Sequence, residues 1–267
     1  MSILPSLAFV LILASALVQV VFLFGRGRTA DPVSHWLLAA AAAILAALIA
    51  ARSASIGFPA LTGTFESLVF YALTVCVLAA AYRLQGRLVF MPFVQFGATI
   101  AAAALLAVAS SPIAPRQMLA PIPALRSFWL VAHVAFSFVG ESFFVVSFVS
   151  ALALLLSRDE ERRRAYDRIT YTSIAVGYPI FTTGALIFGA IWAEQAWGSW
   201  WSWDPKETWA LVTWLVYTVY LHVRFVGKWG GSGRRTLPAA VAAAAFLCTL
   251  FTFFGVNFLL PGLHSYA

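Results

Sequence analysis

Tryptophans gather in one short stretch of this chain. Seven of the ten tryptophans lie between residues 192 and 214, and residues 194–206 read EQAWGSWWSWDPK. Tryptophan is common at membrane surfaces because its ring is apolar and its N–H is polar, which explains Trp192, Trp209 and Trp214. Four indoles crowded into one short loop form a broad, flat, electron-rich surface instead, and this favours a large planar apolar ligand. The expected ligand-binding tryptophans are Trp197, Trp200, Trp201 and Trp203.

Two of the four histidines flank this stretch in the sequence. His133 lies near the start of a helix predicted over residues 128–156, and His264 lies in the C-terminal tail. The topology predicted below places both on the same side of the membrane as the tryptophans. Two neutral imidazoles on opposite faces of a porphyrin give six-coordinate iron. The pattern therefore favours heme held between His133 and His264 over two unrelated interfacial histidines.

The other two histidines are predicted to lie deeper. Counting ~1.5 Å per residue from Pro205 places His222 ~26 Å along its helix, too far to share one porphyrin with His133. His222 could ligate heme at a second station with an imidazole from elsewhere, or it could be an interfacial residue. His35 has a comparable predicted depth. A His35–His222 pair is the less favoured hypothesis, because an interfacial histidine needs no special function.

A helix-start signal closes the tryptophan stretch. Asp204 can cap the next helix, Pro205 can take its first position, and Glu207 follows three residues after the cap. This is a variant of the capping box, so Asp204 and Glu207 have a sound structural role. Lys206 at the same boundary could pair with an anionic group such as a heme propionate, or anchor the helix at the interface. Both readings of Lys206 remain open.

The elements that position these residues are predicted to be membrane helices. The chain is 62% hydrophobic and 10% charged, with mean hydropathy +0.90, so it has too little polar surface for a soluble domain. A helix needs about 20 apolar residues to cross a bilayer, and its backbone must pair within the segment. We expect an all-α polytopic membrane helical bundle forming a single domain over residues 1–267. Its eight predicted spans are 3–24, 33–51, 66–82, 88–110, 128–156, 172–193, 207–225 and 238–258.

The charges of the connections predict the orientation. With the amino terminus outside, 13 of the 17 Lys and Arg residues fall in inner connections, as the positive-inside rule requires. Both termini and the loop at 194–206 then face the outside, which is the periplasm or cell exterior of a bacterial inner membrane. Residues 1–24 are interpreted as a retained span, because Arg26 and Arg28 follow the apolar run and no basic residue precedes it. The net charge of +7 reflects this orientation and does not indicate nucleic acid.

The tryptophan motif resembles the WWD signature of heme-handling membrane proteins. The stretch from Trp197 through Asp204-Pro205-Lys206-Glu207-Thr208-Trp209 is similar to the CcsA (ResC) branch of system II cytochrome c biogenesis. It is less similar to the CcmC and CcmF branches. The resemblance covers most of the chain from the third predicted helix onward. It extends to Phe58-Pro59, to Trp129 with His133, to Thr213-Trp214-Leu215, to Tyr220-Leu221-His222 and to Leu263-His264-Ser265-Tyr266.

This resemblance implies a heme-handling subunit of a holocytochrome c synthase complex. Such a protein moves heme b to the outer side and presents it for thioether attachment to a C-x-x-C-H apocytochrome c. The implied partners are a CcsB/ResB-type membrane subunit, the apocytochrome and a thioredoxin-like thiol reductant. By motif position, His133 and His264 match the outer heme ligands. His222 matches a ligand within the membrane whose companion comes from the partner subunit.

Two residues depart from the family pattern, and other functions stay open. Arg126 stands where an uncharged polar residue is expected. Glu141 lies mid-helix, ~12 Å deeper than His133 and roughly on the same face, as a protonated carboxyl or part of a polar pathway. The alternatives are a protein that delivers heme to a separate chaperone, as in the CcmC branch, a b-type electron-transfer subunit, or a transporter of another aromatic substrate.

Overall fold

The computed structural model describes residues 3–25, 30–118, 120–225 and 235–260. Within these ranges all regular secondary structure is helical, which confirms the predicted all-α fold. The elements are α1 (Ile3–Phe24), α2 (Ser34–Ile56), α3 (Thr64–Leu84), α4 (Pro92–Ala109), η1 (Pro123–Leu125), α5 (Phe128–Leu156), α6 (Glu160–Phe181), η2 (Thr182–Phe188), α7 (Gly189–Trp197), α8 (Pro205–Phe225), α9 (Thr236–Leu250), η3 (Phe251–Gly255) and α10 (Val256–Leu259).

Every predicted span coincides with a helix of the structure. Seven helical segments are long and apolar enough to cross a membrane, where α6 through α7 count as one segment and α9 with η3 as another. The remaining helix, α8, has 21 residues but a lower hydropathy. Its charged residues Lys206, Glu207 and Arg224, together with its aromatic and imidazole side chains, lower that value. The chain is therefore an integral membrane protein.

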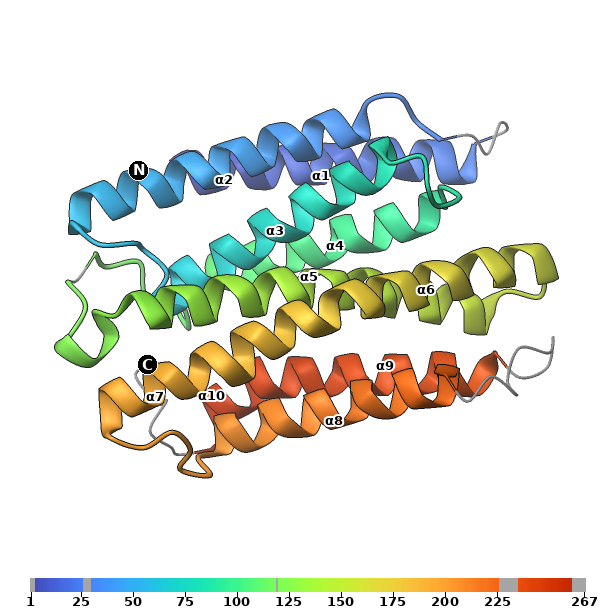
Figure 1. The fold of residues 1–267 in the computed structure, drawn as a ribbon. Coiled ribbons are helices and arrows are strands. Elements are labelled where there is room, and N and C mark those ends of the chain that lie inside the picture. Colours follow the sequence, from blue (N-terminus) through green and yellow to red (C-terminus); the bar gives the residue numbers. More distant parts are fainter. Residues whose placement is uncertain (1–2, 26–29, 119, 226–234, 261–267) are drawn as a thin grey trace.

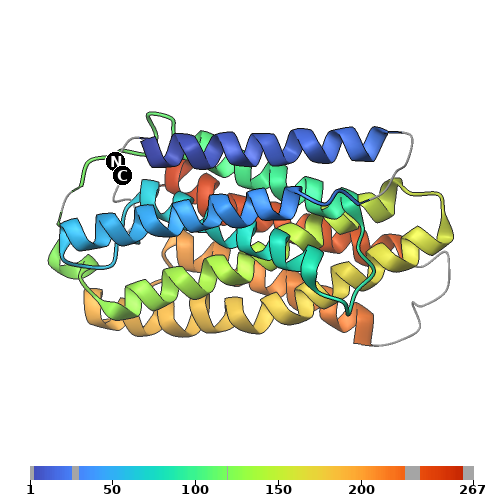
Figure 2. The ribbon, with the colours of Figure 1, turned by 90° about the horizontal axis from the view of Figure 1, so that it is seen from above.

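The helices run along one common axis in two groups (Figures 1 and 2). Helices α1 to α4 pack on one another, and α3 and α4 also contact the central helix α5, which packs on α6 and α9. One end of the bundle carries the start of α1, the connections α2–α3, α4–α5 and α7–α8, and the end of α10 (Figure 1). We name it the outer end, after the predicted topology, and the opposite end the inner end.

Glycines let α5 and α6 approach each other closely. A Cβ atom added to Gly140 would lie 2.7 Å from the backbone nitrogen of Phe181. One added to Gly177 would lie 2.8 Å from the carbonyl oxygen of Gly140. Small residues at such crossings are the usual way in which membrane helices bring their backbones together. This close packing brings the outer half of α5 against η2.

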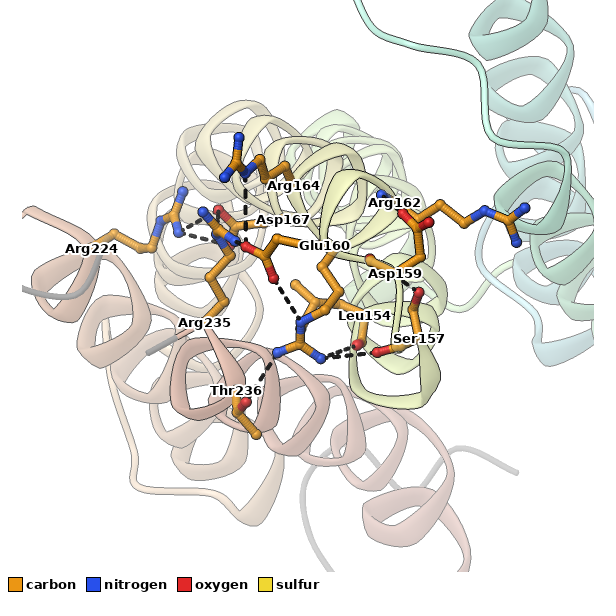
Figure 3. Close-up of polar contacts among 11 residues, drawn as sticks. Leu154, Ser157, Asp159, Glu160, Arg162, Arg164, Asp167, Arg224, Arg235 and Thr236 are labelled. Carbon is orange, nitrogen blue, oxygen red and sulfur yellow. Dashed lines mark hydrogen bonds and ion pairs between the residues drawn. The ribbon is translucent and has the colours of Figure 1, made fainter. Parts of the chain in front are cut away.

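A network of charged side chains ties the inner ends of α6, α8 and α9 (Figure 3). Arg224 of α8 donates to both carboxylate oxygens of Asp167 at 2.7 and 2.9 Å. Arg235, just before α9, pairs with Glu160 at the start of α6. Arg163 donates to the carbonyl oxygens of Leu154 and Ser157 and to the Thr236 hydroxyl. These contacts hold helices that are distant in sequence in one arrangement.

The loop that was predicted at 194–206 is shorter in the structure. Helix α7 continues to Trp197, and Gly198 ends it in the left-handed conformation at φ 71°, donating its N–H to Glu194 O at 2.9 Å. Glycine adopts this conformation without a steric cost, so it is the common residue after a helix end. The connection between α7 and α8 therefore comprises residues 198–204. The outer connection before α5 contains a turn at residues 110–114 and the short helix η1.

Candidate functional site

Hydrogen bonds at the start of α8 hold the tryptophan loop in place. Asp204 Oδ1 accepts the N–H of Lys206 at 2.9 Å, which confirms the predicted cap. The Glu207 carboxylate accepts the N–H and hydroxyl of Ser202, and so reaches farther back than a standard capping box does. Between these caps, Trp203 has φ 61°, which is unusual for any residue with a Cβ atom. Hydrogen bonds on both sides of Trp203 thus impose its backbone conformation.

The four predicted loop tryptophans have different environments. Trp200 and Trp201 line a cavity at the outer end of the bundle. Trp197 packs edge-on against Trp192 with ring centroids 4.7 Å apart. Trp203 contacts Trp201 at 5.8 Å and is 68% exposed. Two of the four indoles therefore face the cavity directly, and the other two support or flank them.

His133 lies on α5 at the wall of the same cavity. Its Nδ1 atom is 2.9 Å from the carbonyl oxygen of Gly184. A carbonyl can only accept, so Nδ1 carries the proton and Nε2 keeps its lone pair. No residue in the described part of the chain hydrogen-bonds to Nε2. This arrangement, with one ring nitrogen held by a backbone carbonyl, is the usual one for a metal-binding imidazole.

The π-helical segment η2 fixes the orientation of the His133 ring. Gly184 O accepts the N–H of Gly189 in the i to i+5 pattern and accepts His133 with its second lone pair. A Cβ atom on Gly189 would lie 3.0 Å from His133 Nδ1, so glycine leaves room for the ring. The prediction from the sequence missed both glycines. Their spacing of five residues gains a meaning only once the segment is known to be π-helical, so the sequence alone carried no signal for them.

Trp192 packs against the ring of His133. The two rings lie nearly parallel, at 16° with centroids 6.2 Å apart. Trp192 is 2% exposed and donates its Nε1–H to Ala124 O at 2.9 Å. The interfacial interpretation of Trp192 was therefore wrong, because its N–H bonds to a backbone carbonyl rather than to water. Trp192 belongs to the site itself.

The cavity beside His133 has a volume of about 120 Å³ and opens to the outside. Aromatic and small side chains form much of its wall, including Phe138, Phe181 and Gly189. Four buried polar atoms on its lining have no hydrogen-bond partner among the described residues. They are Ser137 Oγ, Glu141 Oε2, Trp201 Nε1 and Glu207 Oε1.

Such a gathering of unpartnered polar atoms points to a ligand or bound water. Leaving a polar atom buried without a partner costs about 1–3 kcal/mol. Native proteins therefore seldom gather several of them in one place. The cavity also confirms that Glu141 shares the face of α5 that carries His133, as the helical spacing predicted.

Lys206 brings a positive charge to the same space. Its Nζ atom donates to Asn257 Oδ1 at 2.9 Å and lies 5.9 Å from the centre of the Phe253 ring. Glu141 and Glu207 line the same cavity, but neither forms an ion pair with Lys206. A cation in a mostly apolar cavity is unfavourable unless an anion joins it. This environment favours the anion-binding interpretation of Lys206 over a purely interfacial anchor.

Two other histidines, His222 and His35, do not join this site. His222 is exposed on the surface of α8, with Nδ1 2.9 Å from Thr218 O, so its Nε2 faces away from the bundle. His35 is buried at the inner end of α2, a helix that packs with α1 and α3, whereas α8 packs with α6 and α9. The structure therefore contradicts the His35–His222 pair. His264 lies outside the described residues, and its predicted role is untested.

Fold and site together define an integral membrane protein with a histidine and tryptophan site at one end. Residues 63–264 match the model of a family described as "Cytochrome C assembly protein". The chain is 37% identical over 236 residues to "Cytochrome c biogenesis protein CcsA" of Chlamydomonas reinhardtii, covering 84% of this chain and 65% of that relative. It is 36% identical over 299 residues to the CcsA of Prochlorococcus marinus (strain MIT 9303), covering 97% and 91%. The chain therefore belongs to the cytochrome c assembly protein family, as a CcsA-type cytochrome c biogenesis protein.

A solved structure shares the fold. The chain described as "Cytochrome c Heme Lyase CcmF" superposes with a TM-score of 0.69 at 18% sequence identity. The match covers 94% of this chain and 46% of that chain. At this level of identity the likeness concerns the arrangement of the helices alone.

Proposed function

We propose that this protein binds heme at its outer end and presents it for covalent attachment to apocytochrome c. It would act as the heme-handling subunit of a system II cytochrome c synthase in a bacterial inner membrane, with the WWD loop facing outward. The observation that carries the proposal is His133, whose Nε2 lone pair is open beside a tryptophan-lined cavity. CcsA relatives named for cytochrome c biogenesis support the same assignment.

The donor set suits heme better than a bare metal ion. No group of three or more His, Cys, Asp or Glu side chains that could hold a metal ion occurs in the described part of the chain. Heme iron needs only one or two protein ligands, because the porphyrin supplies the other four. His133 is the proposed ligand on one face, and His264 is the proposed ligand on the other by family resemblance. The proposed cargo is heme b, held by Trp200, Trp201 and their neighbours.

Lys206 is the proposed partner of a heme propionate. The charge-assisted hydrogen bond would supply the anion that this buried cation needs. It would also fix which edge of the porphyrin faces Lys206, and so leave another edge for the vinyl groups. Binding and orientation are what a protein contributes when the cofactor and the thiols carry the chemistry.

His222 is the proposed ligand of a second heme station within the membrane. Its imidazole is exposed on α8 with Nδ1 held by Thr218 O, and the family resemblance assigns the second ligand to another subunit. A CcsB/ResB-type membrane subunit is the proposed source of that ligand. The other proposed partners are the apocytochrome and a thioredoxin-like reductant that keeps its cysteines as thiols. The delivery alternative without attachment has no observation of its own in its favour.

The test is heme binding by the complex purified in mild detergent. The wild type should show a six-coordinate heme spectrum in both oxidation states. His133→Ala should lose the outer heme and cytochrome c maturation, and added imidazole should restore the spectrum of His133→Gly. His35→Ala is the matched control and should retain both. Unchanged heme content and maturation in His133→Ala would exclude the proposed site.

A further inference from the structure

A second hollow borders the cavity at the outer end. Its volume is about 480 Å³, and His133, Trp192, Lys206 and Phe253 line both spaces. Neither Trp200 nor Trp201 contributes to the second hollow. Its wall comes instead from the α2–α3 connection and from the connection before α5. Residues that line only this hollow include Thr62, Gly63, Gln117, Ala120 and Pro121. The His133 ring therefore stands in a partition between an indole-lined space and a loop-lined space.

The loop over the second hollow is tethered at both ends. Arg52, which is buried and ion-paired with Glu66, donates to the carbonyl oxygen of Arg116 at 3.1 Å. At the other end, Ala124 O accepts the Nε1–H of Trp192 at 2.9 Å. Between these tethers lie prolines, which restrict the backbone further. The loop is preorganised, and preorganisation lowers the entropy cost of binding a second chain.

The backbone of this loop offers free hydrogen-bonding groups. Among the described residues, the N–H groups of Gln117, Met118 and Ala120 make no hydrogen bond to backbone or side chain. Ile122, between two prolines, has the polyproline-II angles φ −59° and ψ 158°. Thr62, on the opposite wall, likewise has an N–H without a described partner. Extended backbone with open donors and acceptors is what a bound peptide strand pairs with.

We propose that the second hollow binds the extended, thiol-bearing segment of the acceptor polypeptide while heme occupies the indole-lined cavity. The inference rests on the proposed function and adds the location of the second substrate. The two substrates would meet at the partition of His133, Trp192 and Lys206. There a cysteine S–H adds across a heme vinyl group. Sulfur bonds to one vinyl carbon and the hydrogen ends on the other, so the addition consumes no oxidant or reductant.

Site-specific cross-linking tests the location directly. A photoreactive benzoylphenylalanine replaces Gln117 in the heme-loaded complex, and a peptide carrying C-x-x-C-H is added. The matched probe replaces Ser202, which is exposed in the tryptophan loop and does not line the second hollow. The Gln117 probe should capture the peptide and the Ser202 probe should not. Capture from Ser202 alone, or capture of lipid or the partner subunit from Gln117 with the peptide in excess, would overturn the assignment.

Filling each hollow in turn separates this inference from the proposed function. Thr62→Trp should raise the peptide concentration for half-maximal attachment about ten-fold, because the larger ring occupies the second hollow. The heme spectrum should not change. Ala190→Trp, which fills the indole-lined cavity, should lower heme content instead. If Ala190→Trp retains heme, the proposed function fails. If Thr62→Trp retains heme and needs the same peptide concentration for half-maximal attachment as the wild type, only the assignment of the second hollow fails.

Discussion

The inner network and the outer cavity differ in whether their polar side chains have hydrogen-bond or ion-pair partners. In the inner network, Arg224 forms an ion pair with Asp167, and Arg235 forms one with Glu160 (Figure 3). Arg163 donates hydrogen bonds to a backbone carbonyl and a hydroxyl. In the outer cavity, by contrast, four buried polar atoms lack partners in the described structure. Satisfied networks rigidify a fold, whereas unsatisfied groups are stable only when something else completes them. The inner network therefore holds the helices together, and the outer cavity is suited to receive a ligand.

The largest effect should follow from Gly184→Ala. The added Cβ would overlap the backbone nitrogen of Ser137 and the carbonyl carbon of Phe136, and no flexible side-chain end is there to yield. It should destabilise the protein by about 1–3 kcal/mol and displace the carbonyl that holds His133. Thermal unfolding in detergent and heme content per folded molecule check both effects.

The matched control for that change is Gly57→Ala, at another glycine near the outer end. Gly57 has φ 72°, and an added Cβ there would meet no atom within 4 Å. Its substitution should therefore lower stability only through backbone strain, by about 1 kcal/mol, and heme content should stay normal. Loss of heme in both variants would show that the outer end responds to any loss of stability, and the comparison above would fail.

Asp167→Asn should be the next largest change, and it should affect stability alone. The substitution removes the charge that pairs with Arg224, and both side chains are mostly buried at 15% and 21% exposure. Breaking a buried pair costs 3–5 kcal/mol and an exposed one almost nothing, so about 1–2 kcal/mol is expected here. Heme bound per folded molecule should not change.

Glu161→Gln on the exposed face of α6 is the control for Asp167→Asn, and its unfolding midpoint should match that of the wild type. A selective loss of heme in Asp167→Asn, without a change in the midpoint, would show that the inner network serves the ligand site too.

The difference between the two ends also explains how much could be predicted from the sequence. The helices and the Asp204 cap follow from local rules, since hydropathy and capping residues act over a few positions. His133 could be chosen as a candidate because histidine is rare within membrane spans. Trp192 and Gly184 could not, because their roles depend on how α5 packs against a π-helical segment. A π-helical turn is a small departure from an α-helix that local preferences do not specify.

Lys206→Met should weaken heme binding without a comparable loss of stability. Losing a charge-assisted hydrogen bond to a propionate should reduce affinity about ten-fold, whereas Lys206→Arg should retain most of it. Heme dimethyl ester provides the control ligand, because it lacks the carboxylate charge. It should bind wild type and Lys206→Met with similar affinity. Equal losses for heme and its ester would show that Lys206 acts only through the structure of the loop.

The smallest effect should come from Trp203→Gly, in which two opposing terms nearly cancel. Glycine removes the strain of the left-handed backbone at φ 61°, a gain of about 1 kcal/mol. It also removes the contact with Trp201 at 5.8 Å, and such aromatic pairs contribute about 0.5–1.5 kcal/mol. Stability should therefore change little, while the edge of the indole surface beside Trp201 loosens.

Trp203→Phe separates the two terms, because it keeps both an aromatic ring and the strained backbone. Heme dissociation rates should rank wild type slowest, then Trp203→Phe, then Trp203→Gly, if the loop contributes mainly through its rings. The reverse order of the two variants would mean that backbone strain at Trp203, rather than its ring, shapes the outer end.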